Sequence, residues 1–220
     1  MNKYKAEREE ICKVCHLLYD RGYVVSNDGN VSMRVGENQV LITPSGVSKG
    51  RITADMLVLC DLDGNILDGD RYPSSESAMH FMIFKERPDV NSVVHAHPPM
   101  STAFAVCHKS LDKPYLTEMI SGLGEVPVTE FAMPSTEQVP NSVKPFVKEH
   151  NAVLLANHGS IAWGENLWKA FDRLETVEQT GKIFFYVEQM GGGVEFSQAQ
   201  REELINLTGF YKKMAGKRER

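Results

Sequence analysis

Two histidines separated by a single residue are the side chains of this sequence best suited to metal chemistry. They lie in the segment VVHAHP at 93–98, whose apolar start and final proline predict a strand over residues 91–97. Residues two apart on a strand point to the same face, so His95 and His97 project side by side. Two imidazoles so placed can occupy neighbouring positions around a metal ion. The same spacing is also typical of polar residues on a half-buried strand, and both interpretations stand at this point.

A third histidine, His158, follows a short apolar strand predicted over residues 152–157 and precedes Gly159. Its ring is therefore expected at the edge of a sheet, where functional sites form. Three histidines and a carboxylate would leave zinc one exchangeable position, which is typical of a catalytic rather than a structural centre. Spacing alone does not bring residue 158 next to residue 97, so a metal site and an ordinary polar turn remain alternatives.

Two polar turns offer groups that could bind an anion. They are TPSG at 43–46 and PSSE at 73–76, and the second precedes a helix predicted over 76–87. Serine hydroxyls, free backbone N–H groups and the positive end of the helix dipole can hold a phosphate there. Ordinary capping of the helix is the alternative. The pair Gly29-Asn30, in a tight turn, is open to the same two interpretations.

Composition and charge exclude several classes of protein. The chain has 220 residues, of which 42% are hydrophobic, and this predicts one compact domain over residues 1–220. The formal net charge is −5, with Lys and Arg scattered, so no basic face for nucleic acid or anionic membrane is expected. The N-terminus is polar, and no stretch approaches the roughly 18 apolar residues of a membrane span. We therefore expect a cytoplasmic protein.

The segment CKVCH at 12–16 matches the attachment motif of c-type haem. The context does not fit, because that attachment requires export and the polar N-terminus predicts no signal peptide. The segment lies in a helix predicted over 4–21, in which Ile11, Cys15 and Leu18 share one face. These cysteines are therefore expected to be buried. They are also expected to be reduced, because disulfides are rare in cytosolic proteins.

Helical and strand patterns interleave along the whole chain, which favours an α/β layered domain. Further helices are expected at 99–108, at 166–190 and after the capping box formed by Ser197 and Gln200. Further strands are expected at 31–35, 39–43, 56–61 and 160–163.

Five short motifs then combine into a resemblance. G-N at 29–30, T-P-S-G at 43–46, P-S-S-E at 73–76, H-A-H-P at 95–98 and N-H-G at 157–159 occur in order and at characteristic separations. In this register the sequence resembles the class II aldolase/adducin family over roughly residues 5 to 190. The resemblance implies a three-layer α/β/α fold around a largely antiparallel sheet. It also implies a homotetramer with active sites at subunit interfaces.

The resemblance also assigns roles to residues of this sequence. His95, His97 and His158 match the residues that bind Zn²⁺ in the family. Another divalent transition metal could take the place of zinc. Glu76 matches the carboxylate that binds the resting metal and moves a proton during turnover. The positions that match the phosphate site are Gly29, Asn30, Ser45, Gly46, Ser74 and Ser75. The implied reaction is retro-aldol cleavage of a ketose 1-phosphate, similar to fuculose phosphate, to dihydroxyacetone phosphate and a short aldehyde.

Two positions discriminate between branches of the family. The pentose-phosphate 4-epimerases have aspartate where this sequence has Glu76, so glutamate favours C–C cleavage. Glu118 replaces a tyrosine with which the aldolases reach the neighbouring subunit's site, and it is similar to a proton-transfer residue of the methylthioribulose-phosphate dehydratases. An exposed surface carboxylate is the alternative for Glu118. Retention of the histidines and Glu76 argues against a non-enzymatic adducin-like assembly module.

Overall fold

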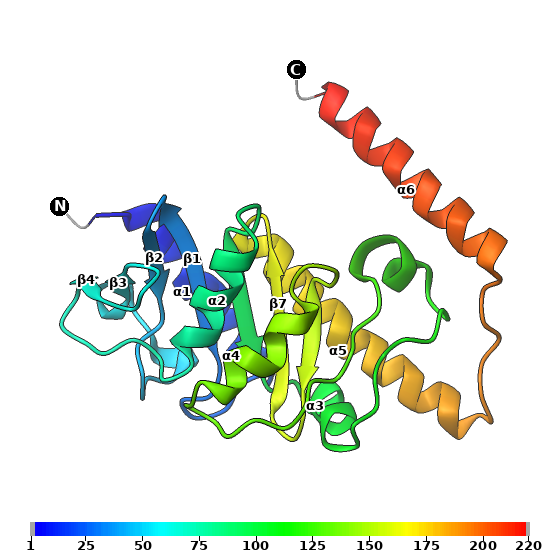
Figure 1. Ribbon diagram of the computed structural model, residues 1–220, viewed down its shortest axis with the longest axis horizontal. Helices are drawn as coiled ribbons and strands as arrows, with labels where there is room; N and C mark the ends of the chain where they lie inside the picture. Colours follow the sequence, from blue (N-terminus) through cyan, green and yellow to red (C-terminus); the bar gives the residue numbers. More distant parts are fainter. Residues whose placement is uncertain (1–2, 219–220) are drawn as a thin grey trace.

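Seven strands form one sheet in the order β4-β3-β2-β1-β5-β7-β6, and every neighbouring pair is antiparallel (Figure 1). The structure, a computed structural model, describes residues 3–218 without the side chains of residues 208 and 210–218, so the ends of the predicted domain lie outside it. The strands are β1 (Asn30–Gly36), β2 (Gln39–Ile42), β3 (Val58–Cys60), β4 (Ile66–Asp68), β5 (Ser92–Ala96), β6 (Ala152–Leu155) and β7 (Gly159–Gly164).

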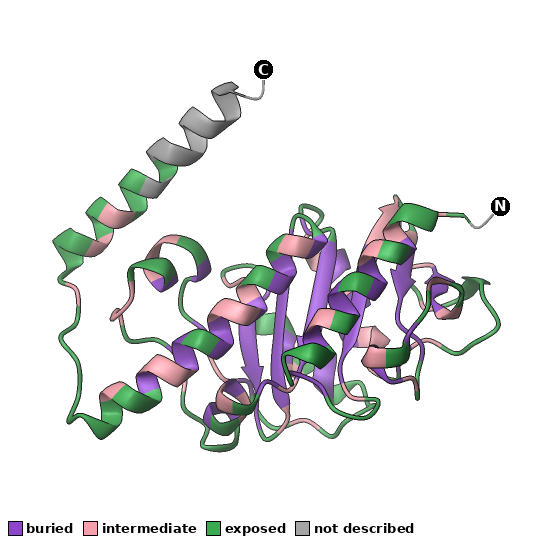
Figure 2. Ribbon diagram, turned by 180° about the vertical axis from the view of Figure 1, so that it is seen from behind, coloured by how far each residue is buried: buried purple, intermediate pink, exposed green. Residues whose placement is uncertain are grey.

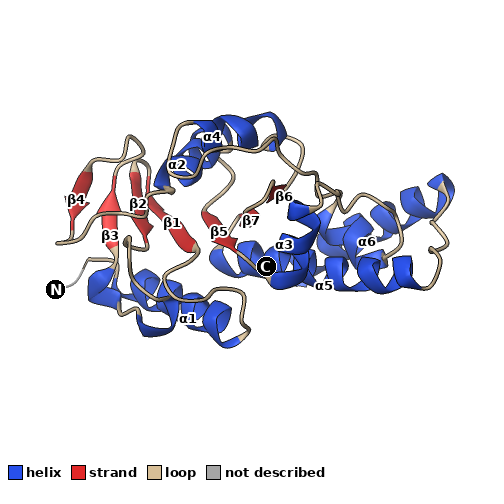
Figure 3. Ribbon diagram, turned by 90° about the horizontal axis from the view of Figure 1, so that it is seen from below, coloured by secondary structure: helices blue, strands red, loops and turns tan. Residues whose placement is uncertain are grey.

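Helices cover both faces of the sheet (Figure 3). On one face lie α2 (Ser77–Glu86) and α4 (Gln138–Val143), and on the other lie α1 (Lys5–Asp20), α3 (Pro99–Val106) and α5 (Leu167–Gln189). The three-layer α/β/α arrangement around an antiparallel sheet, implied by the resemblance, is confirmed. Between residues 3 and 218 we find no helix that is both long enough and apolar enough to cross a bilayer.

The sheet separates two hydrophobic cores, because alternate side chains of each strand point to opposite faces. In β6, Val153 and Leu155 belong to the core that includes residues of α2 and α4. Ala152 and Leu154 belong to the core that includes residues of α1, α3 and α5. The strands in the middle of the sheet are buried almost throughout (Figure 2). The same alternation directs His95 of β5 toward the α2 face.

Two local predictions from the sequence are confirmed, one on the cysteines of α1 and one on the start of α6. Cys12 and Cys15 are buried, free thiols within α1. The capping box at the start of α6 (Gln198–Arg218) is confirmed, since the Ser197 N–H donates to Gln200 Oε1 at 2.9 Å and the Gln200 N–H donates to Ser197 Oγ at 3.3 Å. The short exposed strand β4 was not expected, because the three residues Ile66, Leu67 and Asp68 are too few to show an alternating pattern.

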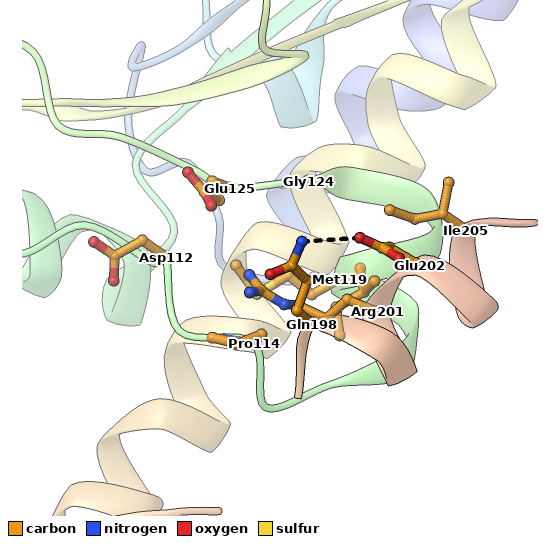
Figure 4. Close-up of a pocket in the computed structure, with 10 residues that line it drawn as sticks. Asp112, Pro114, Met119, Gly124, Glu125, Gln198, Arg201, Glu202 and Ile205 are labelled. Atoms are coloured by element: carbon orange, nitrogen blue, oxygen red, sulfur yellow. Dashed lines mark hydrogen bonds between the residues drawn. The ribbon is translucent and has the colours of Figure 1, made fainter. Parts of the chain in front are cut away.

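Helix α6 extends away from the layered body (Figures 1 and 2). Its first turns lie beside a π-helical turn at Met119–Leu123 and bound a hollow of about 450 Å³ (Figure 4). The hollow is lined by apolar side chains such as Ile205 and by the charged residues Arg201 and Glu202. None of the described histidines lines it, so this hollow is separate from the candidate metal ligands.

A buried carboxylate on α5 anchors the segment that follows the histidine pair. Glu178 is fully buried and accepts hydrogen bonds from the N–H groups of Met100 at 3.1 Å and Ser101 at 2.8 Å, in the first turn of α3. An anion at this position satisfies free helix amides and complements the dipole. The contact fixes where the chain leaves β5.

Replacement of Glu178 by alanine should destabilise the protein by about 2–3 kcal/mol, because two buried N–H groups lose a charged acceptor. Urea unfolding followed by circular dichroism measures the change. The matched control on the same helix is Glu188→Ala, which removes only an exposed ion pair with Lys109 and should cost under about 0.5 kcal/mol. Equal losses in the two variants would contradict the anchoring role.

Candidate metal centre and anion pocket

Three imidazoles meet where β5 ends beside the β6–β7 hairpin. His95 lies in β5, His97 follows the end of that strand, and His158 lies in the turn before β7. Their ring centroids are 4.8 to 4.9 Å apart. One ring nitrogen from each lies within 4.8 Å of the others. The structure thus brings together the three histidines that the sequence analysis proposed as ligands.

Strand register and a glycine make this meeting possible. β5 pairs with β7 so that Ala96 lies opposite Ser160, which places the hairpin turn beside His97. A side chain at Gly159 would meet the Ala96 carbonyl oxygen and the His97 ring, each at 2.6 Å. Only glycine therefore allows the two backbones to approach this closely. The requirement explains the N-H-G motif in physical terms.

The Glu76 carboxylate closes the cluster from the start of α2. Its two oxygens lie 3.3 Å from Nε2 of His95 and 3.3 Å from Nε2 of His158. The Nε2 atoms of His95 and His97 lie 3.1 Å apart. Donors that surround a tetrahedral ion at about 2.0–2.1 Å are about 3.3 Å from one another. The spacing and the chemistry of the donor set therefore fit one small divalent ion.

Acceptor groups on the far side of two of the rings orient their Nε2 lone pairs toward the cluster. His95 Nδ1 lies 2.9 Å from the Ser160 carbonyl oxygen, which can only accept, so Nδ1 carries the proton and Nε2 is free to bind a cation. His97 Nδ1 lies 3.7 Å from the Asp28 carboxylate. Partners of this kind fix the tautomer and orientation of metal-binding histidines.

Burial and the neighbouring rings favour the neutral forms of His97 and His158. Burial, together with the smaller effect of the His95 ring, lowers the pKa of His97 to about 3 and that of His158 to about 4. Burial alone would raise the pKa of Glu76, but the imidazoles of His95 and His158 and the Asn30 amide outweigh it, so the pKa of that carboxyl lies well below its ordinary value. Neutral imidazoles and an ionised carboxylate are the forms that bind metal.

A line of buried hydrogen bonds runs from Glu76 into the α2 face of the sheet. Asn30 Nδ2 donates to Glu76 Oε2 at 2.9 Å, and Asn30 Oδ1 lies 2.5 Å from His80 Nε2. His80 Nδ1 lies 2.7 Å from the Ser32 hydroxyl. Ser32 and His80 are fully buried. Sequence analysis did not single out either residue, because one serine on a strand and one histidine on a helix carry no distinctive pattern.

A polar cavity of about 180 Å³ opens beside Glu76. Six of its lining residues are the predicted phosphate-site residues Gly29, Asn30, Ser45, Gly46, Ser74 and Ser75. Glu76, His97 and His158 line the same cavity, and His95 lies buried behind them. The histidine cluster and the candidate anion turns therefore form one continuous site.

The cavity also contains Lys49, which sequence analysis missed. Its ammonium group donates to the carbonyl oxygens of Asn27 at 2.9 Å and Val47 at 3.1 Å, and its side chain is 1% exposed. Two acceptors leave one of its three N–H groups available. Burial lowers the pKa of Lys49, while the Asp28 carboxylate acts in the opposite direction. A lysine in a turn is common, so its sequence carried no signal that this cation lines the site.

Glu118 lies apart from this cavity in the chain described. It precedes the π-helical turn, is exposed, and accepts a hydrogen bond from the Thr117 hydroxyl at 2.8 Å. Hydrogen bonds from its own backbone N–H and from Thr117 lower the pKa of this carboxyl. The residue lines a different hollow, together with Arg21 and Glu175. The structure therefore does not bring Glu118 to the candidate metal ligands of its own chain.

Comparison with known proteins identifies the family of the site. The model of the Class II Aldolase and Adducin N-terminal domain matches residues 9–185. A 3-oxo-tetronate 4-phosphate decarboxylase of Haemophilus influenzae is 33% identical over 188 residues, which cover 83% of this chain and 89% of the relative. An L-fuculose phosphate aldolase of Methanococcus maripaludis is 32% identical and covers 82% of this chain and 97% of the relative.

Solved structures agree with this assignment. An L-fuculose 1-phosphate aldolase superposes with a TM-score of 0.84 at 30% identity, over 90% of this chain and 94% of the other. The L-fuculose-1-phosphate aldolase of Thermus thermophilus gives a TM-score of 0.74 at 31% identity, over 86% and 97% of the two chains.

The buried His80 should make the stability of the metal-free protein depend on pH. Burial, assisted by the nearby His95, lowers the pKa of His80 to about 3, whereas an unfolded chain binds this proton near pH 6.5. The unfolded state therefore takes up more protons, and the free energy of unfolding falls as pH drops from about 6.5 to about 3. His80→Gln should make this decline shallower by up to about 1.4 kcal/mol per pH unit.

Urea unfolding of chelator-treated protein at several pH values between 4 and 7 measures this slope. The control is His16→Gln, which replaces an exposed histidine on α1. An identical change of slope in both variants would show that the burial of His80 is not its cause.

Proposed function

The chain belongs to the class II aldolase and adducin family, and we propose that it is a zinc-dependent lyase that cleaves a ketose 1-phosphate into dihydroxyacetone phosphate and a short aldehyde. One observation carries this proposal: the Glu76 carboxylate lies 3.3 Å from both His95 and His158 beside a cavity lined by the serines before α2. A carboxylate held in this way can bind a metal at rest and transfer a proton when it is displaced.

In this proposal His95, His97, His158 and Glu76 hold the ion. A divalent ion bound there supplies a Lewis acid that stabilises negative charge on neighbouring substrate oxygens. Three imidazoles and one carboxylate suit zinc, and cobalt or manganese share much of this preference. The four residues thus orient the substrate oxygens next to the carboxylate that handles the proton.

The substrate phosphate is assigned to the far end of the cavity. Ser74 and Ser75 precede α2, whose first N–H groups and dipole favour an anion. Gly46, in the turn at 43–46, has a φ of 72°, which directs the backbone of that turn toward the same cavity. The buried ammonium group of Lys49 adds a positive charge. Phosphate binding away from the bond that breaks fixes the pose of the substrate.

Glu76 is suited to accept and return a proton because its pKa depends on its partners. Beside the imidazoles it is ionised, and displacement by substrate removes the contacts that lower its pKa, while burial continues to raise it. In cleavage, a base removes the proton of the C4 hydroxyl, the C3–C4 bond breaks, and the aldehyde leaves. The electron pair remains as an enediolate, which Glu76 protonates at C3 to form dihydroxyacetone phosphate.

The base for the C4 hydroxyl is assigned to Glu118 of a neighbouring subunit in a homotetramer. Glu118 is exposed and outside the cavity of its own chain, which is the situation of a residue that acts across an interface. The lowered pKa of its carboxyl keeps it ionised at neutral pH and able to accept a proton.

A second candidate reaction comes from the relative named as a 3-oxo-tetronate 4-phosphate decarboxylase, which is 33% identical to this chain. Loss of CO₂ from such an acid leaves the same enediolate of dihydroxyacetone phosphate, and Glu76 would protonate it at the same carbon. Decarboxylation requires no base to remove a proton from a C4 hydroxyl, because CO₂ leaves in place of an aldehyde. A functional requirement for Glu118 therefore favours the aldol reaction.

The zinc-loaded protein should exchange one C3 hydrogen of dihydroxyacetone phosphate with D₂O, because that step runs the last proton transfer in reverse. Glu76→Gln should lower the exchange rate at least 100-fold, by the usual scale of general acid–base catalysis. Proton NMR measures the exchange, and metal analysis checks that zinc remains bound.

The same protein should condense dihydroxyacetone phosphate with lactaldehyde, glycolaldehyde or acetaldehyde. Exchange without condensation, together with CO₂ release from 3-oxo-tetronate 4-phosphate, would select the decarboxylase. Wild-type protein that shows neither exchange nor condensation would contradict both candidates. Exchange at the wild-type rate in Glu76→Gln would contradict the role of Glu76.

Glu118 can be tested by complementation between subunits. Glu118→Ala and His97→Ala should each be inactive in condensation, whereas oligomers co-assembled from both variants should recover part of the activity, because some sites then contain both intact residues. The control is each variant refolded alone. A fully active Glu118→Ala variant would show that this glutamate is an ordinary surface carboxylate.

A further inference from the structure

Every group in the buried line of hydrogen bonds behind Glu76 has only one consistent orientation. An ionised carboxylate can only accept, so Asn30 must present Nδ2 to Glu76. Its other atom, Oδ1, is then an acceptor that faces His80 Nε2, and that nitrogen must carry the proton. In the neutral ring the opposite nitrogen, Nδ1, accepts from the Ser32 hydroxyl. All donors therefore point from Ser32 toward Glu76.

The line ends inside the protein. Ser32 lies in β1 and is fully buried, as is His80 in α2. A proton that entered the line at Glu76 would reach no solvent at the far end. The line is therefore unsuited to proton relay. Its effect is to fix the orientation of the hydrogen-bonding groups that form it. Hydrogen bonds in a chain of this kind polarise one another, and a broken member leaves a buried polar atom without a partner.

Asn30 is the member whose orientation affects the site. It lines the cavity and contacts Glu76 at the same time. If the amide turned by 180°, Oδ1 would face the carboxylate and repel it. Asn30 is the first residue of β1, so the strand holds its backbone in place. Its terminal amide is free to turn unless His80 donates a hydrogen bond to it.

We propose that His80 is a positioning residue, which holds the Asn30 amide in the orientation that keeps the Glu76 carboxylate against His95 and His158. This inference rests on the proposed function of the centre, in which Glu76 binds the metal and carries a proton. The line of hydrogen bonds would serve to orient Glu76 for these two roles. His80 does not line the cavity, and its ring forms hydrogen bonds with Ser32 and Asn30, so its effect on Glu76 passes through Asn30. Its place one helical turn after Glu76 ties the carboxylate and its orienting group to the same helix.

Cobalt-substituted protein gives a readout that needs no substrate. The visible absorption of Co²⁺ reports the number and kind of its ligands, and therefore whether Glu76 contacts the metal. His80→Leu, which removes the donor to Asn30, should change this spectrum. His80→Gln keeps an N–H donor at a similar distance from the backbone and should restore most of it. The matched control on the same helix is Ile83→Val, a core change that should leave the spectrum unaltered.

Kinetics then separate positioning from a general loss of structure. His80→Leu should lower the maximal rate of C3 hydrogen exchange about 10- to 100-fold, the usual effect of removing an outer partner of a metal site. KM for dihydroxyacetone phosphate should change by less than about threefold, because His80 reaches the phosphate site only through Asn30 and leaves the turns that contain Ser74, Ser75 and Gly46 in place. His80→Gln should recover most of the rate.

The outcomes are distinct. An unaltered cobalt spectrum in His80→Leu, or a spectrum that Ile83→Val changes equally, would overturn the positioning role. If His80→Leu does not fold, Ser32→Ala replaces it, since it frees the His80 ring to reverse its tautomer, and an unaltered spectrum there would overturn the role as well. Wild-type protein that binds cobalt without exchanging the C3 hydrogen contradicts the proposed function, while the spectra still decide the role of His80. Absence of cobalt binding would overturn both.

Discussion

The approach of the Glu76 carboxylate to two imidazoles, with the third beside them, is the interaction on which the rest of the site depends. Neutral imidazole nitrogens at 3.1 Å present lone pairs to each other, and this is unfavourable without a cation or a proton between them. Burial disfavours the proton, as the lowered pKa values of His97 and His158 indicate. The fold thus holds together a set of donors that a divalent ion would stabilise.

Three separate features of the fold enforce this arrangement. The antiparallel pairing of β5 with β7 places the hairpin turn beside His97, and Gly159 removes the side chain that would separate them. Helix α2 begins at the same edge and presents Glu76 from its first turn. Glu178 anchors the chain after the histidine pair. The anion turns lie around the same helix start, so one edge of the sheet positions both halves of the proposed chemistry.

Sequence analysis predicted those parts of the site that depend on local geometry. Alternation along a strand predicted that His95 and His97 share a face, and the capping box predicted where α6 begins. It did not place His158, whose position follows from a pairing register that no local pattern contains, and only the family resemblance suggested it. Lys49 and His80 were missed because their roles depend on burial by distant segments. Glu118 was singled out by the resemblance alone, and it lies away from the cavity of its own chain.

The central claim is that one divalent ion binds between Glu76, His95, His97 and His158. X-ray absorption at the zinc edge, on protein loaded with one equivalent of Zn²⁺, tests it most directly. We expect three imidazole nitrogens and at least one oxygen at about 2.0–2.1 Å, and loss of an imidazole contribution in His97→Ala. Sulfur scatterers at about 2.3 Å, or a spectrum that is identical in His97→Ala, would contradict the claim.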